Sequence, residues 1–114
     1  MEKYIYVINI ENTDIYKIGI SKYHPSLRIK QIQTGNPFKL SIQKFYLTDK
    51  ANLLEKILHR RFASKKVIED DFLALKGEWF KLTPEDILSF EEKCNKIIEN
   101  IDFVKKNSTY QNKF

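Results

Sequence analysis

The pattern of apolar positions near the N-terminus predicts a β-hairpin. Even-numbered and odd-numbered positions of residues 3–10 are both largely apolar. The even positions are Tyr4, Tyr6, Ile8 and Ile10, and the odd ones include Ile5, Val7 and Asn9. This is typical of a strand that is covered on both faces. The cluster Glu11-Asn12-Thr13-Asp14 predicts a turn, and residues 15–20 predict a second strand.

The length of that turn decides where two polar side chains lie. With four residues in the turn, Ile8 faces Lys17 on the neighbouring strand. Because side chains alternate along a strand, Tyr6 and Lys17 then lie diagonally on one face of the hairpin. A register slip of one residue would place them on opposite faces.

Helical and strand-like spacings alternate through the rest of the chain. Pro25 can begin a helix that Gly35 ends, and Thr83-Pro84 followed by two acidic residues is a helix start with a capping threonine. The last helix has apolar residues at spacings of three and four from Ile87 to Val104. In chain order, we expect a helix over 27–33, a strand over 40–47, a helix over 50–64, a short strand over 78–82 and a helix over 84–104.

This order of elements predicts an α+β fold with one small, mostly antiparallel sheet (strand–strand–helix–strand–helix–strand–helix) flanked by helices. The 114 residues suit one domain. We expect that domain to span 1–104, including the C-terminal helix 84–104, and to be followed by a polar, disordered tail over 105–114. The segment 65–76 has a mixed pattern that predicts no element.

Composition narrows the cellular setting. No segment approaches the roughly 18 consecutive apolar residues of a membrane span. The N-terminus runs directly into strand-like sequence, without the pattern of a signal peptide. The single cysteine, Cys94, excludes an internal disulfide and a cysteine-based zinc site, and it falls on the apolar stripe of the last helix. We therefore expect a cytoplasmic protein with no membrane partner.

Charge is distributed unevenly along the chain. Residues 1–66 hold 13 Lys/Arg and 5 Asp/Glu, a surplus of eight positive charges. Residues 67–114 hold 7 and 10, a surplus of three negative charges. A basic face built from the first two-thirds of the chain would suit a polyanion. The alternative is a solvated surface whose charges are merely spread unevenly.

Four polar side chains, Tyr6, Lys17, Arg28 and Glu55, can form one site for phosphate chemistry. Phosphodiester hydrolysis needs an activated water and positive charge where the negative charge of the transition state builds. A phenol near a lysine can have its pKa lowered and can then act as a general base or relay to one. A guanidinium suits phosphate oxygens, and a lone carboxylate can hold a largely hydrated Mg²⁺.

Several short motifs resemble those of the GIY-YIG nuclease superfamily. They are Tyr4-Ile5-Tyr6-Val7-Ile8, Tyr16-Lys17-Ile18-Gly19 and Arg28. The branch of the superfamily with K-I-G in its second motif is matched further by Thr34-Gly35-Asn36-Pro37, Glu55-Lys56-Ile57-Leu58-His59 and Gly77-Glu78-Trp79-Phe80. The resemblance covers about residues 3–82. The chain departs from the superfamily pattern at Tyr4, where the first motif has glycine, and at Lys17, where the second has tyrosine. The asparagine found late in many members has no match.

The resemblance implies a metal-dependent endonuclease that hydrolyses nucleic-acid phosphodiesters, with DNA as the expected polymer. It implies that Tyr6 and Lys17 activate water, that Arg28 stabilises the transition state and that Glu55 holds Mg²⁺ or Mn²⁺. We add His59 to this catalytic set and expect Glu78 to support it by orienting Arg28 or a backbone amide. Five basic residues are expected to contact nucleic acid: Lys30, Arg60, Arg61, Lys65 and Lys66. A homodimer or a targeting partner protein is expected to supply specificity.

Each of these residues also has a purely structural explanation. Tyr6 and Lys17 could be ordinary sheet residues, and Glu55 could simply pair with His59 one helical turn later. Glu78 or the acidic run 69–71 could hold the metal in place of Glu55. At the level of function, the alternative is a catalytically inactive nucleic-acid-binding or regulatory module that keeps the fold.

Overall fold

The N-terminal hairpin forms with the register that the turn length predicts. In the computed structural model, which describes residues 1–68 and 78–111, β1 (Lys3–Ile10) pairs with β2 (Ile15–Ser21), and Ile8 lies opposite Lys17. The Asn9 side-chain amide donates to the carbonyls of Thr13 and Ile15, at 3.0 and 3.1 Å, and so holds the turn closed. Asn12 takes the left-handed conformation, with φ of 64°, that asparagine tolerates better than most residues.

Two further strands complete an antiparallel sheet of four, in the order β3-β1-β2-β4. β3 (Leu40–Thr48) pairs along the whole of β1, whereas β4 (Trp79–Lys81) is short and pairs only with residues 15–17 of β2. The outer edge of β2 beyond Lys17 is therefore free of β4. A helix can therefore contact this part of the β2 edge.

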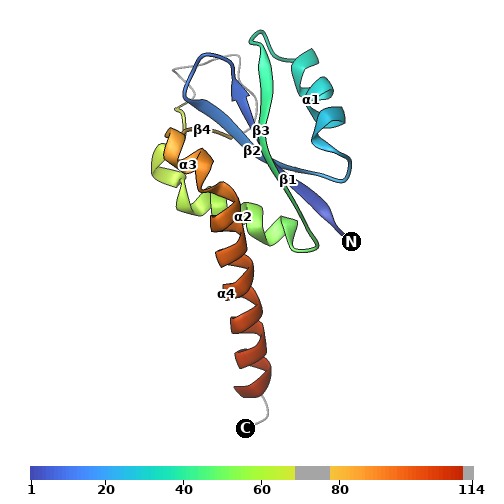
Figure 1. Cartoon of the computed structure of the whole chain (residues 1–114), viewed down its shortest axis with the longest axis vertical. Coiled ribbons are helices and arrows are strands. Elements are labelled where there is room, and N and C mark those ends of the chain that lie inside the picture. The colour runs from blue at the N-terminus through green and yellow to red at the C-terminus, as the bar shows by residue number, and fades with distance from the viewer. Residues whose placement is uncertain (69–77, 112–114) are drawn as a thin grey trace.

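Helices cover the two faces of the sheet (Figure 1). α1 (Pro25–Thr34) packs on the face that carries Tyr6, Ile8 and Ile10. α2 (Ala51–Arg61) and α4 (Phe90–Gln111) pack on the other face, with α3 (Pro84–Leu88) between β4 and α4. The larger core on that second face includes Ile5, Val7, Ile18, Leu54, Leu58, Phe80, Cys94 and Ile97. The expected small α+β fold with a mostly antiparallel sheet is confirmed.

The C-terminal helical region differs from the expected single helix over 84–104. Its start is as expected, because Thr83 and Asp86 form a reciprocal capping box and Pro84 occupies the first turn. The helix then breaks at Ser89, whose hydroxyl bonds the Glu85 carbonyl at 2.8 Å, and α4 begins at Phe90. α4 continues to Gln111, so residues 105–111, expected as a disordered tail, are helical; residues 112–114 lie outside the described residues.

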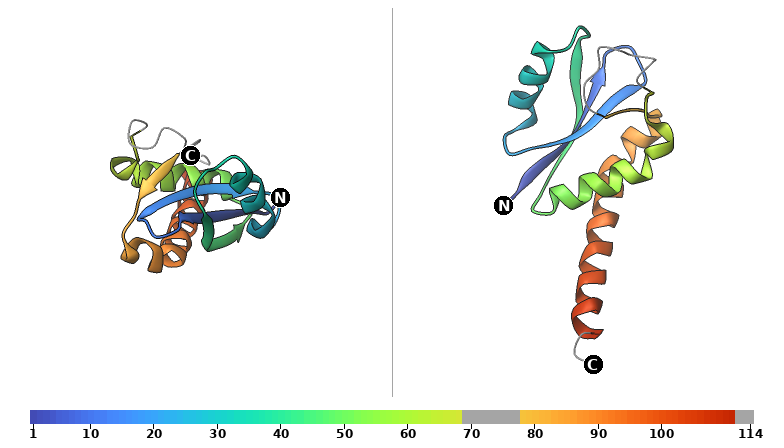
Figure 2. Two further views of the ribbon diagram at one scale, coloured as in Figure 1. Left: turned by 90° about the horizontal axis from the view of Figure 1, so that it is seen from above. Right: turned by 180° about the vertical axis from the view of Figure 1, so that it is seen from behind.

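The far end of α4 extends away from the sheet (Figure 2). The molecule measures 55 × 29 × 23 Å along its principal axes. Of the expected apolar stripe, Cys94 and Ile97 are fully buried, but Val104 is 63% exposed because the helix has by then left the domain. The boundary at residue 104 stays a prediction.

The other element bounds are close to those expected. α2 ends at Arg61 rather than near residue 64, and a 3₁₀ turn, η1 (Ala63–Lys65), follows it. Most of the segment 65–76, including the acidic run 69–71, lies outside the described residues. No helix among residues 1–68 and 78–111 is long and apolar enough to cross a membrane.

Candidate functional site

Tyr6 forms the floor of the site, and Gly19 makes room for it. The two residues lie opposite each other on β1 and β2, and Tyr6 is only 1% exposed. A Cβ built on Gly19 would lie within 2.9 Å of three atoms of the phenol group, so a side chain there would occupy the space of the ring. The glycine of the K-I-G motif thus has a steric role: it lets the phenol lie flat across β2.

The phenol of Tyr6 is held in its protonated form. Burial raises its pKa, and the nearby Glu55 charge acts in the same direction, while a hydrogen bond and the charge of Arg28 oppose the rise. We expected Lys17 to lower the pKa of this phenol. The structure gives the opposite direction, because desolvation of a ring this deeply buried outweighs the neighbouring cation.

Lys17 lies on the same face as Tyr6, as the hairpin register predicts. Its strand neighbours are Ile8 on β1 and Trp79 on β4, and its Nζ lies 5.6 Å from the centroid of the Trp79 ring. Burial lowers the pKa of Lys17, the Arg28 charge lowers it further, and Glu55 and Glu78 oppose both effects. A half-buried lysine of lowered pKa can reach its neutral, proton-accepting form more readily than a surface lysine.

Arg28 projects from the first turns of α1 toward Lys17. The helix begins cleanly, because Pro25 occupies its first position and the His24 ring accepts from the Ser26 amide at 3.1 Å. The Arg28 guanidinium donates to the Gln31 side chain at 2.8 Å. A pocket of about 300 Å³ lies between α1 and the sheet, lined by Lys17, Arg28, Gln31, Ile32, Gly35, Asn36 and Trp79.

Glu55 reaches the same site from α2, around the edge of β2. Its charge acts on both Tyr6 and Lys17. One turn later, the His59 Nε2 lies 2.8 Å from the Ile18 carbonyl, on the stretch of the β2 edge that β4 leaves free. The structure therefore brings Tyr6, Lys17, Arg28 and Glu55 together, although α2 packs mainly on the opposite face.

His59 is held from both sides. Its Nδ1 pairs with the Glu78 carboxylate, and Glu78 also binds Lys66 at 3.2 Å. The Lys66 hydrogen bond is the main reason that the pKa of Glu78 lies below its usual range. We expected Glu78 to orient Arg28 or a backbone amide; it contacts His59 and Lys66 instead, since β4 places it beside α2 rather than α1. The alternative pairing of Glu55 with His59 is not formed.

A metal ion beside Tyr6 and Lys17 would find the carboxylate of Glu55. Among residues 1–68 and 78–111, no group of three or more His, Cys, Asp or Glu side chains is placed to hold a metal. Within those ranges the Glu55 carboxylate has no hydrogen-bond or ion-pair partner, so its oxygens are available. Mg²⁺ commonly keeps several waters and takes one or two carboxylates plus substrate phosphate. The single carboxylate of Glu55 fits a largely hydrated Mg²⁺. It does not fit a metal that is surrounded by protein ligands alone.

The five basic residues expected at nucleic acid come from different elements. Lys30 and Arg60 are exposed, on α1 and α2. Lys65 forms an ion pair with Asp86 at 2.7 Å, and Lys66 forms an ion pair with Glu78 at 3.2 Å. Their contact with nucleic acid stays a prediction.

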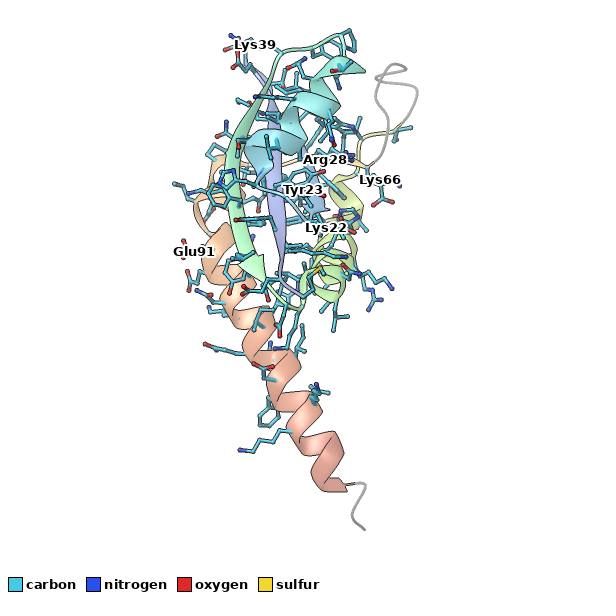
Figure 3. The ribbon with its side chains drawn as sticks, turned by 90° about the vertical axis from the view of Figure 1, so that its right-hand side faces the viewer. Lys22, Tyr23, Arg28, Lys39, Lys66 and Glu91 are labelled. Carbon is cyan, nitrogen blue, oxygen red and sulfur yellow. The ribbon has the colours of Figure 1, made fainter. Side chains whose placement is uncertain are left out.

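Other residues of the site carry no clear signal in the sequence. Gln31 and Asn36 line the pocket with Trp79, which is buried. Lys22 and Tyr23 lie between β2 and α1, the helix that carries Arg28 (Figure 3). Lys22 and Tyr23 follow directly after β2, and a basic and aromatic pair at a strand end would have been the signal to follow.

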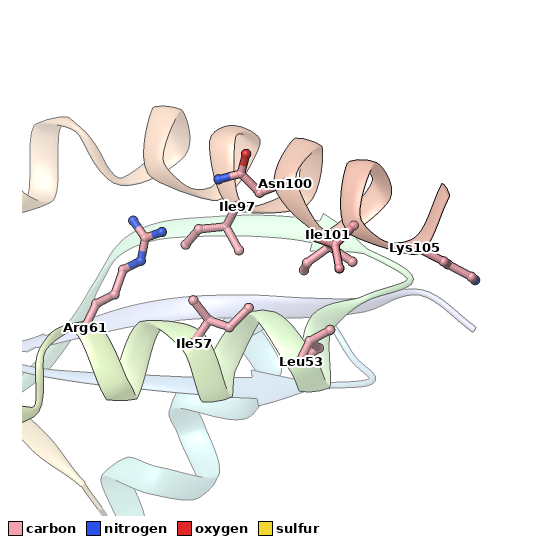
Figure 4. A pocket seen from close by; sticks show the side chains of 8 residues that line it. Leu53, Ile57, Arg61, Ile97, Asn100, Ile101 and Lys105 are labelled. Atoms are coloured by element: carbon pink, nitrogen blue, oxygen red, sulfur yellow. The ribbon is translucent and has the colours of Figure 1, made fainter. Parts of the chain in front are cut away.

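A second hollow, larger than this pocket, lies elsewhere. It has a volume of about 580 Å³, separates α2 from α4 (Figure 4), and is lined mainly by Leu53, Ile57, Ile97, Ile101 and Val104, with Arg61, Asn100 and Lys105. Its lining has no acid, histidine or cysteine. We therefore place phosphate chemistry in the smaller, polar pocket.

Comparison with known proteins identifies the family. A search of curated proteins and a search of solved structures both returned no match. The family model that matches is that of the T5orf172 domain, over residues 3–101. This corrects the expected assignment to the GIY-YIG superfamily, because the matching model describes a different family. The chain belongs to the T5orf172 domain family, a family of nuclease-like, DNA-binding domains.

Proposed function

We propose that this protein is a metal-dependent endonuclease that hydrolyses nucleic-acid phosphodiesters, with DNA as its polymer. The observation that carries the proposal is that Tyr6 and Glu55 act electrostatically with Lys17 and Arg28, the two cations that line the pocket, and that the four residues come from four different elements. Membership of a nuclease-like family supports the same class of reaction.

The two cations of the pocket have separate tasks. Arg28 binds the non-bridging phosphate oxygens and neutralises the negative charge that builds on them in the transition state. Lys17, whose pKa is lowered first by burial, accepts the proton of the attacking water. The buried Tyr6 phenol remains protonated and donates a hydrogen bond that orients the water or the phosphate.

Glu55 would hold Mg²⁺ or Mn²⁺ beside these groups. When bound, the metal supplies positive charge to the phosphate and the leaving oxygen. The contacts of His59 with Ile18 and Glu78 fasten α2 to the edge of β2 and so keep Glu55 in reach of the pocket. His59 is thus a positioning residue in this proposal, and Glu78 supports it.

The test is a cleavage assay on plasmid and labelled linear DNA with Mg²⁺, Mn²⁺ or EDTA. We expect metal-dependent nicking that Arg28→Ala and Glu55→Gln each reduce by about 100- to 1000-fold. Lys96→Ala is the control, because Lys96 is an exposed cation on α4, which packs on the opposite face of the sheet. Wild-type protein that never cuts in any metal, or full activity in both pocket variants, would refute the proposal.

One observation favours a second candidate, a binding or regulatory module without turnover. Glu55 acts on Tyr6 and Lys17, but the described residues hold no group of three or more possible metal ligands, and a nuclease with two metals would need more. The same two variants separate the candidates when binding is measured in EDTA. A module predicts that Arg28→Ala weakens DNA binding while the wild type shows no cleavage at any metal concentration.

A further inference from the structure

The face of the sheet that carries Tyr6 is covered along only part of its length. α1 begins at Pro25 and packs over the half of the sheet that holds Ile8, Ile10, Ile15 and Leu40. Toward the start of β1, the same face carries Tyr4 opposite Leu47 and Tyr6 opposite Phe45. Phe45 is 49% exposed and Leu47 is 46% exposed. Large apolar side chains gathered at the surface commonly mark a binding site.

Three rings form a connected cluster on this uncovered half. His24 lies 4.9 Å from Phe45 and 5.4 Å from Tyr4 between ring centroids, and Tyr4 lies 5.9 Å from Phe45. All three pairs meet edge to face, and His24 and Phe45 are exposed. Tyr23, next to His24 in the chain, is 63% exposed.

This aromatic surface, defined as Tyr4, Tyr23, His24 and Phe45, adjoins the pocket. Phe45 is the strand partner of Tyr6, and the backbone N–H of Arg28 donates to the carbonyl of His24, one helical turn earlier, at 3.4 Å. The rings therefore lie one helical turn and one strand from residues of the site. A partner must present negative charge at the pocket and flat apolar surface beside it. A nucleotide strand has both, as phosphates and as bases.

We propose that the aromatic surface stacks the unpaired bases of a single nucleic-acid strand whose backbone enters the Lys17–Arg28 pocket. The inference rests on the proposed function for the place of the backbone, and it adds that the preferred polymer is single-stranded or locally unpaired. A duplex hides the faces of its bases in the stack, so it could use the cations but not the rings. Stacking accepts any base, which predicts little sequence preference.

The experiment is a binding titration by fluorescence anisotropy in EDTA, which prevents cleavage. Three labelled DNAs of equal length are compared: a single strand, the same strand with its bases removed, and a duplex. We expect the intact strand to bind about 5- to 100-fold more tightly than the abasic strand, from stacking of one base. Tyr23→Ala and Phe45→Ala should each lose most of that difference, and Lys22→Ala should weaken both single strands alike.

Phe103→Ala is the matched control for Phe45→Ala. Phe103 is 68% exposed on the projecting part of α4, away from the aromatic surface, and its replacement should leave the three affinities unchanged. Tyr23→Ala keeps the test valid should Phe45→Ala disturb β3, because Tyr23 lies outside the strands and helices.

Equal affinity for the intact and abasic strands would overturn the inference, as would tighter binding of the duplex or no binding of any DNA. A protein that cuts duplex DNA yet ignores the bases keeps the proposed function and loses this inference. A protein that never cuts but binds bases through Tyr23 and Phe45 loses the proposed function and keeps this inference.

Discussion

The replacement Gly19→Ala tests the geometry on which the site depends. The added methyl group would overlap three atoms of the Tyr6 phenol, all within 2.9 Å of the new Cβ. Tyr6 is 1% exposed and packs in the core under α1, so the ring has no solvent to move into. The phenol must shift away from Arg28, or the strands must separate.

Overfilling a packed core costs about 1–3 kcal/mol, and this contact involves ring atoms rather than a flexible chain end. We therefore expect the free energy of unfolding to fall by about 2 kcal/mol and the melting temperature by about 8 °C. Urea titrations followed by circular dichroism and by Trp79 fluorescence measure the change. Cleavage should fall as well, because the displaced phenol no longer lies beside Lys17 and Arg28.

A double-mutant cycle with Tyr6→Leu separates this contact from a general intolerance at position 19. Leucine removes the phenol, so Gly19→Ala should cost less in that background, with a coupling of about 1 kcal/mol or more. Gly35→Ala is the control, since a Cβ there meets nothing within 4 Å and φ is −97°. Additive costs in the cycle, or a Gly19→Ala protein as stable and active as the wild type, would refute the steric argument.

Three further predictions follow from charges in the structure. Cleavage should rise with pH toward the lowered pKa of Lys17, and Lys17→Arg, which keeps the charge but cannot act as a base, should abolish that rise while binding in EDTA persists. Although burial opposes it, hydrogen bonds from Lys65, Thr83 and Lys93 hold the pKa of Asp86 well below its usual range. That group stabilises the fold above about pH 4 and ceases to do so as pH falls through its folded pKa, so Asp86→Asn should cost about 2 kcal/mol in urea titrations at pH 7 and progressively less below pH 4. DNA affinity should fall steeply between low and moderate salt, and an affinity flat in salt would contradict a phosphate contact at Arg28 and Lys17.

The hairpin and its register were predictable because they depend on local chemistry. The four-residue turn needs a residue that tolerates the left-handed conformation, and Asn12 is that residue. It also needs hydrogen bonds that close it, and the Asn9 side-chain amide donates them. Once the turn length is known, alternation alone puts Tyr6 and Lys17 on one face. The capping box at Thr83 and the buried Cys94 were predictable for the same reason, because helix caps and apolar stripes are local patterns.

The electrostatics of the site were not predictable, because they depend on burial. Proximity of Lys17 suggested a phenol of lowered pKa at Tyr6, but the ring lies so deep that desolvation reverses the sign. Lys65 looked like a phosphate contact in a run of basic residues. In the fold it lies over Phe62 and binds Asp86, a residue 21 positions later that no local pattern pairs with it.

The approach of Glu55 to Tyr6 follows from the shortness of β4. An edge strand needs partners for its outward carbonyls, and β4 supplies them only along residues 15–17 of β2. Beyond that point the His59 ring takes the Ile18 carbonyl, and Glu78, the residue before β4, holds the opposite nitrogen of the same ring. Because His59 holds α2 at the edge of β2, the turn of α2 before His59 extends past this edge, toward the face that α1 covers. Glu55 is on that turn, so the end of one short strand determines that a helix from the far side of the sheet contributes the carboxylate of the site.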